Sequence, residues 1–290
     1  MTRIISSLAE VAARYQAAFV DLWGCVHDGE RAIPSAVAAL QAFRAGGGAV
    51  VLVTNSPKPQ KGVEEQLDLF GVPRDAWDSI ATSGDSARAA MFRGMVGQKV
   101  FFIGESRDMP FFEPMKVIDE PVDIRLVELA EAEGIVCTGP FDPEADPAEL
   151  RPQLLLAKQN GLKLLCANPD IVVDRGARRE WCAGAVARLY TDMGGESLYF
   201  GKPHPPIYDL AYRRLAELGR DTSTAGILAI GDGAQTDIRG AMGEDLDSLF
   251  ISGGLARDET RTTDSPDATA LERYLAGESV APNYAMGQLR

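Results

Sequence analysis

Five polar side chains that could bind a phosphate and a divalent cation follow apolar runs of the sequence. They are, in chain order, Asp21, Thr54, Lys202, Asp232 and Asp237. Carboxylates suit Mg²⁺, a hard cation that takes few protein ligands because it keeps several waters. A lysine ammonium and a threonine hydroxyl can donate hydrogen bonds to phosphate oxygens. These residue types favour phosphoryl transfer, in which a carboxylate attacks phosphorus and forms an aspartyl-phosphate.

The elements that would position these side chains are the strands of a parallel sheet. The chain repeats a short apolar run, a turn and a helical pattern, which predicts an α/β fold with helices covering a mostly parallel sheet. The runs that precede the polar residues are 17–20, 49–53, 198–200 and 227–230. Ligands of open α/β sheets bind beyond the carboxyl ends of the strands, so we expect the four ends to converge on one site.

The rest of the chain predicts further elements of the same kind. Near the N-terminus, Ser7 and Glu10 have the spacing of a capping box and predict a helix to about Tyr15. The middle of the chain predicts strands over residues 100–103, 135–137 and 162–166, and helices over 148–158 and 180–191. Since no low-complexity linker separates this part from the rest, we expect a second domain to be an insertion between strands.

The segments around the polar residues resemble a known family. FVDLWG, VTN, GKPHP and GDGAQTD occur in the order of the four motifs of the haloacid dehalogenase superfamily. CANPDIVVDRG, WCAGAVARLYTDMGG and YFGKPHPPIYD are similar to class IIA, the nitrophenylphosphatase-like branch. The resemblance implies an α/β protein with a Rossmann-like core and a parallel sheet, built from residues 1–84 and 196–290. A smaller C2-type α/β cap domain, residues 85–195, would be inserted into that core.

The resemblance also implies roles for individual residues. Asp21 would be the nucleophile and Mg²⁺ ligand, with Thr54 and Lys202 binding the phosphate. Asp232 would be a second metal ligand, and Asp237 would be a further ligand or would orient one. Three more residues would face the substrate; they are Asn55, Asn168 and Asp170.

One position departs from the family pattern. The first motif of the superfamily normally reads Asp-x-Asp, and its second Asp protonates the leaving oxygen and then activates water, but Trp23 stands there. Trp23 could still bind Mg²⁺, because this position ligates the metal through its backbone carbonyl. The missing acid–base group is typically worth ~10²–10⁴-fold in rate. Our hypothesis is that His27 or Asp28, on the loop after the first strand, replaces it.

Three functions follow from this pattern. The first is a Mg²⁺-dependent phosphatase that acts on a small phosphorylated metabolite, in which a good leaving group could also compensate for Trp23. The second is a non-catalytic protein that binds a phosphorylated ligand. The third, cleavage of a carbon–halogen or carbon–phosphorus bond, is weaker because the class IIA segments point to phosphate esters. A cap of this type often provides a dimer contact in the resembled family, so a homodimer is also expected.

Composition argues against other classes of partner. The formal net charge is −13, which disfavours nucleic acid and anionic lipid. Of this excess, −9 lies in residues 113–149, within the expected cap, so a phosphorylated substrate remains compatible with the site. No apolar run approaches the ~20 residues that cross a bilayer. The four cysteines lack CxxC spacing, which is typical of reduced thiols in a cytoplasmic protein.

Overall fold

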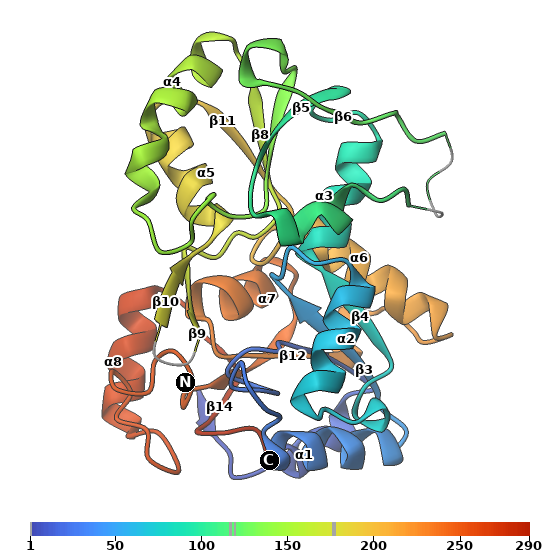
Figure 1. Cartoon of the computed structure of the whole chain (residues 1–290). Helices are drawn as coiled ribbons and strands as arrows, with labels where there is room; N and C mark the ends of the chain where they lie inside the picture. Colours follow the sequence, from blue (N-terminus) through green and yellow to red (C-terminus); the bar gives the residue numbers. More distant parts are fainter. Residues whose placement is uncertain (1, 116–117, 119, 176–177) are drawn as a thin grey trace. The chain divides into compact units, whose positions relative to one another are not determined.

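A computed structural model describes residues 2–115, 118, 120–175 and 178–290 of the chain. The chain divides into two compact units, which are coloured along the sequence in Figure 1. Unit 1 comprises Met1–Thr54, Glu64–Ala81 and Lys202–Arg290, and unit 2 comprises Asn55–Val63 and Thr82–Gly201. Within the described residues, no helix is both long and apolar enough to cross a membrane.

Unit 1 is built on a seven-stranded sheet. Its strands, in sheet order, are β1 (Arg3–Ile4), β14 (Tyr284–Met286), β13 (Asp247–Ile251), β12 (Ile227–Gly231), β2 (Ala17–Val20), β3 (Ala49–Thr54) and β4 (Ser79–Thr82). The pairings from β1 through to β3 are parallel. The central strands β2, β3 and β12 are buried along their whole length, as expected for a parallel sheet covered on both faces.

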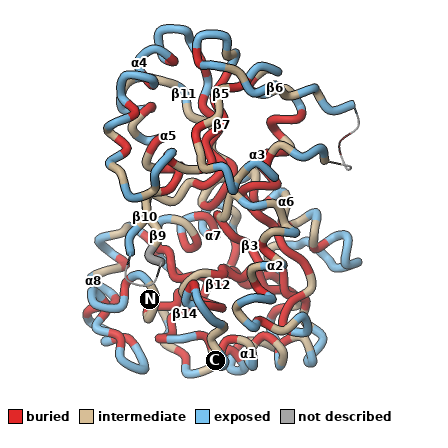
Figure 2. The backbone as a smooth tube through the Cα atoms, in the orientation of Figure 1, coloured by how far each residue is buried: buried red, intermediate tan, exposed pale blue. Residues whose placement is uncertain are grey.

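Helices pack on the sheet of unit 1 through their apolar faces. They are α1 (Pro34–Ala45), α2 (Gln60–Phe70, which begins in unit 2), α6 (Pro205–Glu217), α7 (Arg239–Gly243) and α8 (Ala268–Glu278). One core cluster joins Ile207, Ala211 and Leu215 of α6 to Phe19 and Val51 of the sheet. The three α6 positions recur every four residues, which is the spacing of one helix face. The continuous buried backbone of the sheet is visible in Figure 2.

Unit 2 has its own sheet of five strands. They are, in order, β11 (Glu196–Tyr199), β8 (Lys163–Cys166), β7 (Gly134–Cys137), β5 (Lys99–Ile103) and β6 (Arg125–Leu126), all paired in parallel. Its helices are α3 (Ser83–Phe92), α4 (Arg151–Gln159) and α5 (Ala183–Asp192). Separately, β9 (Val172–Arg175) and β10 (Arg178–Trp181) pair with each other in antiparallel orientation. An α/β fold with two mostly parallel sheets is thus confirmed.

Two sequence predictions about elements are wrong. The run before Lys202 forms β11, which pairs with β8 in unit 2, so it is not a strand of the sheet that carries the other three runs. The expected first helix is only two short 3₁₀ turns, Leu8–Glu10 and Ala12–Arg14. Ser7 makes no side-chain cap bond. Glu10 instead accepts a hydrogen bond from the Ser6 backbone at 2.6 Å and pairs with Arg3, and these contacts stabilise the turn without extending a helix.

Candidate active site

Three of the predicted residues lie at the carboxyl ends of neighbouring strands. Asp21 directly follows β2, Thr54 is the last residue of β3, and Asp232 directly follows β12. The β2 strand lies between β12 and β3, and both pairings are parallel. Because the carboxyl ends of parallel strands share one edge, these three residues lie at the same edge of the sheet.

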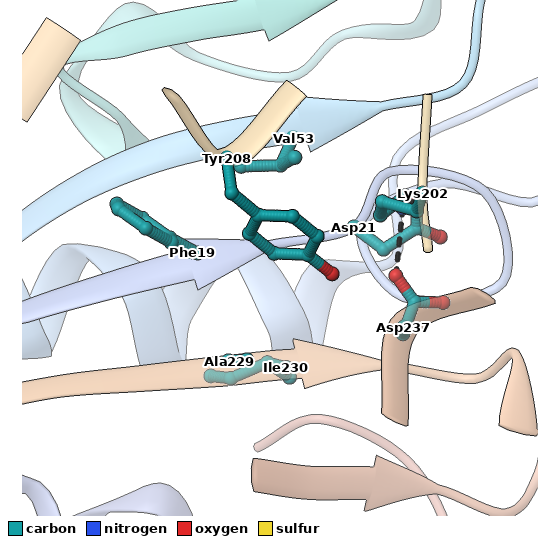
Figure 3. Close-up of a pocket in the computed structure, with 8 residues that line it drawn as sticks. All are labelled: Phe19, Asp21, Val53, Lys202, Tyr208, Ala229, Ile230 and Asp237. Carbon is teal, nitrogen blue, oxygen red and sulfur yellow. Dashed lines mark hydrogen bonds and ion pairs between the residues drawn. The ribbon is translucent and has the colours of Figure 1, made fainter. Parts of the chain in front are cut away.

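Lys202 reaches this edge from the segment between β11 and α6. Its buried ammonium donates to Asp21 Oδ1 and, at 2.7 Å, to Asp237 Oδ1 (Figure 3). Burial alone would lower the pKa of Lys202, but the two carboxylates outweigh burial and hold this pKa well above its ordinary value. Lys202 is therefore charged at neutral pH and stabilises negative charge on Asp21.

Asp237 is held in a fixed orientation by its own turn. It lies in a single π-helical turn, Ala234–Ile238, a type of turn that is frequent at functional sites. While Oδ1 accepts from Lys202, Oδ2 accepts from the Gly233 backbone at 3.0 Å. A Cβ on Gly231 would overlap the Asp237 carboxyl group, so the last position of β12 must be glycine for the two to lie this close together. The carboxylate of Asp237 is thus held between the Lys202 ammonium and the Gly233 backbone.

Asp232 is enclosed by backbone from two loops. The Leu255 N–H donates to its Oδ2 at 3.0 Å. A Cβ on Gly254 or on Gly24 would overlap this oxygen, and Gly24 also has a positive φ of 75°. Glycine is therefore required at both positions if the carboxylate is to lie where it does.

The donor groups at this edge fit a divalent cation. Ligand atoms of Asp21, Asp232 and Cys25 lie within 4.8 Å of one another. Burial, and then the charges of Asp21 and Asp237, raise the pKa of Asp232 well above its ordinary value. A cation bound between these carboxylates would favour their ionised forms. Burial also raises the pKa of the Cys25 thiol, so Cys25 stays protonated and the oxygen donors favour a hard cation such as Mg²⁺.

Comparisons with known proteins agree with this geometry. Residues 18–117 match the model of the haloacid dehalogenase-like hydrolase family, and residues 199–275 match a HAD-hydrolase-like model. The sequence is 39% identical to that of a haloacid dehalogenase-like hydrolase from Brucella suis 1330, whose crystal structure is known. The two structures match with a TM-score of 0.85, and the match covers 99% of this chain and 100% of the other. The chain belongs to the haloacid dehalogenase-like family of hydrolases.

More distant proteins are also similar to this haloacid dehalogenase-like hydrolase. The acid sugar phosphatase of Staphylococcus saprophyticus is 23% identical over 250 residues, which cover 84% of this chain and 89% of the relative. The p-nitrophenyl phosphatase structure from Archaeoglobus fulgidus is 19% identical and covers 94% of this chain and 96% of its own, with a TM-score of 0.71. Phosphatases of this kind are the relatives that the class IIA resemblance predicts, and the likeness to the Archaeoglobus fulgidus structure shows a shared fold.

The position where this haloacid dehalogenase-like hydrolase departs from the motif is packed into a loop of unit 1. The Trp23 indole lies over Gly29, where a Cβ would overlap it, and its ring is 5.5 Å from that of His27. The His27 ring lies 5.0 Å from Phe70, and its Nδ1 accepts from the Gly29 backbone at 3.1 Å. Burial lowers the pKa of His27 to about 4, against the opposing charge of Asp28. His27 is therefore neutral at neutral pH and held by this packing.

Asp28, the other predicted substitute acid, is engaged in a turn. Its Oδ1 accepts from the backbones of Glu30 and Arg31, and its Oδ2 pairs with the Arg31 side chain at 3.4 Å. These hydrogen bonds lower the pKa of Asp28, those from the Arg31 and Glu30 backbones foremost. Its carboxylate is thus ionised at neutral pH, which suits a base better than an acid.

The three residues expected to face the substrate lie together in unit 2. Asn55 Nδ2 donates to Asp170 Oδ1 at 2.8 Å, although the two are far apart in sequence. Asn168 Oδ1 accepts from the Asp170 backbone at 3.0 Å. Gly184, in the first turn of α5, donates to the Asp170 carbonyl at 3.1 Å, and a Cβ there would overlap the Pro169 carbonyl. The loop is therefore fixed against α5.

Some residues that shape the site were missed by sequence reasoning. Tyr208 lines a cavity beside Asp21, and Leu255 and Gly254 enclose Asp232. The Gly253-Gly254 pair after an apolar run is a sequence signal for close backbone approach. Tyr208 had no such signal, because a tyrosine on an apolar helix face is usually a core residue.

Proposed function

We propose that this chain is a Mg²⁺-dependent phosphomonoesterase that acts on a small phosphorylated metabolite. The observation that carries the proposal is the buried Lys202 ammonium in contact with Asp21, with Asp232 at the same strand edge. A carboxylate that is held by a cation, next to a second carboxylate that fits a divalent metal, is the arrangement that phosphoryl transfer to an aspartate needs. The phosphatase relatives support the substrate class.

The chemistry assigned to this chain has two steps. In the first, a carboxylate oxygen of Asp21 attacks phosphorus, the ester P–O bond breaks, and Thr54 and Lys202 stabilise the charge on the phosphoryl oxygens. In the second, water attacks phosphorus, releases inorganic phosphate and restores the Asp21 carboxylate. Asp21, Asp232 and the Trp23 carbonyl would hold Mg²⁺, which would supply positive charge near the same oxygens. Asp237 orients Lys202 throughout.

The step that this chain performs least well is proton transfer to the leaving oxygen. Trp23 has no acidic proton, and the contacts of His27 and Asp28 keep both within their loop. We therefore favour substrates whose leaving group is a weak base. His27 and Asp28 stay predictions as substitute acid–base groups, and either would have to leave its present contacts to act.

A second candidate function is binding of a phosphorylated ligand without turnover. The specific observation in its favour is Trp23 at the acid position, because loss of general acid–base help costs ~10²–10⁴-fold in rate. A pure binding protein has no need of a nucleophile, however, and the contact between Asp21 and Lys202 is retained. We therefore place this candidate second.

Phosphate release separates the two candidates. Wild type would be tested with p-nitrophenyl phosphate, acetyl phosphate and a set of sugar and triose phosphates, each with Mg²⁺ and with a chelator. Asp21→Asn keeps the size and loses the nucleophile, and Asp258→Asn, an exposed substitution in the same unit, is the control. The phosphatase predicts Mg²⁺-dependent release by wild type and the control and none by Asp21→Asn. Thermal stabilisation by substrates without any release would instead establish the binding protein.

We propose in addition that unit 2 corresponds to the cap domain expected over residues 85–195, and unit 1 to the core expected over 1–84 and 196–290. Unit 2 carries the acidic segment 113–149 and the Asn55–Asp170 contact. Exchanging unit 2 loops for those of a relative should therefore change which phosphate ester is hydrolysed. The homodimer and the cytoplasmic location stay predictions.

A further inference from the structure

A small cavity lies behind the ion pair of unit 1, and the proposed chemistry does not use it. Its volume is about 10 Å³. Four apolar and four polar residues line it, and Figure 3 shows all of them: Phe19, Val53, Ala229, Ile230, Asp21, Lys202, Asp237 and Tyr208. All eight are buried in the structure. The residues that line the cavity thus all belong to the buried part of unit 1.

The size and lining of this cavity suit one water molecule. A single water needs roughly 10–15 Å³ of such space together with two to four polar partners, whereas cavities that stay empty are apolar. Asp237 and Tyr208 both line the space, and Figure 3 shows the Tyr208 hydroxyl directed towards the Asp237 carboxylate. A donor and an acceptor are thus available at one small cavity, and a water can bond to both at once.

Tyr208 is held so that its hydroxyl faces the ion pair. It lies on α6, is only 2% exposed, and its hydroxyl points towards Asp237 and Asp21 in Figure 3. The α7 helix also lies close to this hydroxyl. A Cβ placed on Gly240 of α7 would overlap the hydroxyl oxygen, so only glycine leaves room for it. Burial, and then the charge of Asp237, raise the pKa of Tyr208 far above its ordinary value. The hydroxyl therefore keeps its proton and can donate it in a hydrogen bond.

We propose that one ordered water occupies this cavity, accepting from the Tyr208 hydroxyl and donating to the Asp237 carboxylate, and that Tyr208 is thereby a positioning residue for Lys202. Asp237 already accepts from Lys202 at 2.7 Å and from the Gly233 backbone at 3.0 Å. The water adds a third restraint on the same carboxylate. The kinetic consequence of this assignment rests on the proposed function, whereas the water itself does not.

Two variants should each remove the proposed water, by different means. Tyr208→Phe removes its donor and keeps the ring, and Ala229→Val adds methyl groups to the cavity wall and displaces it. Tyr212→Phe is the matched control, because Tyr212 lies one turn further along α6 and does not line the cavity. Far-UV circular dichroism and thermal melting would show that each variant is folded before its kinetics are compared.

High-resolution crystal structures and steady-state kinetics on p-nitrophenyl phosphate with Mg²⁺ test the proposal together. Wild type should show ordered density in the cavity, and both cavity variants should lack it. Both should lose about tenfold in kcat with KM unchanged, as loss of an outer hydrogen-bond partner commonly does, and Tyr212→Phe should match wild type. An empty cavity in wild type overturns the water, and wild-type kcat in folded Tyr208→Phe overturns the positioning role.

Failure of the proposed phosphatase function can be distinguished from failure of the proposed water. If wild type releases no phosphate from any substrate while its cavity holds the water, the phosphatase assignment and the kinetic role of Tyr208 both fail, and the water stands. If wild type releases phosphate and its cavity is empty, the water fails and the phosphatase stands.

Discussion

The Lys202 ammonium lies 2.7 Å from Asp237 Oδ1 and contacts Asp21 on its other side, within the buried interior of unit 1. This one cation links a residue that follows β2 to one that follows β12. When all three are ionised, Asp21, Asp232 and Asp237 carry three negative charges against the single positive charge of Lys202. The remaining charge of −2 is what a divalent cation would balance, so the stability of the site and its metal binding depend on the same groups.

Lys202→Met should destabilise the protein strongly. The substitution removes the cation that pairs with the buried carboxylates of Asp21 and Asp237. Breaking a buried ion pair in this way typically costs about 3–5 kcal/mol in the free energy of unfolding. Urea unfolding at pH 7.5 without metal would measure it. The control is Lys163→Met, because Lys163 is half exposed and its pair with Glu196 should be worth only about 0–1 kcal/mol. A Lys202→Met loss no larger than that of the control would contradict the structure.

Gly254→Ala should weaken binding of divalent cations. A Cβ at this position would overlap Asp232 Oδ2, so the carboxylate must move. We expect the dissociation constant for Mg²⁺ or Mn²⁺, measured by calorimetry, to rise about tenfold or more. Gly277→Ala in α8 is the control, since a Cβ there meets no atom within 4 Å. That control should bind metal normally and gain about 0.5–1 kcal/mol in stability. Unchanged metal affinity in Gly254→Ala would show that Asp232 is not a ligand.

Stability should fall as the pH drops from about 6.5 to about 4 because of His27. Its pKa is lowered to about 4 in the folded protein by burial, whereas it is about 6.5 in an unfolded chain. Between these values the unfolded state binds the additional proton, so the free energy of unfolding decreases with falling pH, by up to about 3 kcal/mol in total. Urea unfolding at pH 7.5, 6 and 5 would measure this.

His27→Gln should remove most of this pH dependence. The other histidine, His204, is also partly buried, and burial lowers its pKa too, so His204→Gln serves as the control and should keep most of the dependence. If both variants retain the wild-type slope, other groups titrate in this window and the packing of His27 against Phe70 and Trp23 is not responsible.

Thr262→Val should cost about 1 kcal/mol in stability, the usual net worth of a buried hydrogen bond. The Thr262 hydroxyl donates to Ser252 Oγ at 2.8 Å and lies 2.8 Å from Thr260 Oγ1, and all three residues are buried. This hydroxyl cluster holds the loop that carries Leu255. Thr222→Val, at an exposed position, should be neutral within about 0.5 kcal/mol. Equal effects of the two variants in urea unfolding would rule out the cluster's role.

The sequence by itself determined which polar residues stand at the carboxyl ends of the central strands of unit 1. Asp21, Thr54 and Asp232 follow buried runs, and parallel pairing forces such ends to one edge, so both the sheet and the gathering of these residues could be predicted. Local pattern was enough because the strands are apolar throughout. It also identified the haloacid dehalogenase-like family, through motifs that are short but ordered.

Only the tertiary structure determined which strands pair, which residues distant in sequence meet, and how deeply a side chain is buried. The run before Lys202 reads as one more strand, yet it joins the sheet of unit 2, since a parallel strand's partner is chosen by packing and not by its own residues. The Asn55–Asp170 contact and the place of Tyr208 behind Asp237 likewise join residues that are distant in sequence. His27 looked like an accessible loop residue, but burial against Phe70 makes it neutral, because the surroundings of a side chain set its pKa.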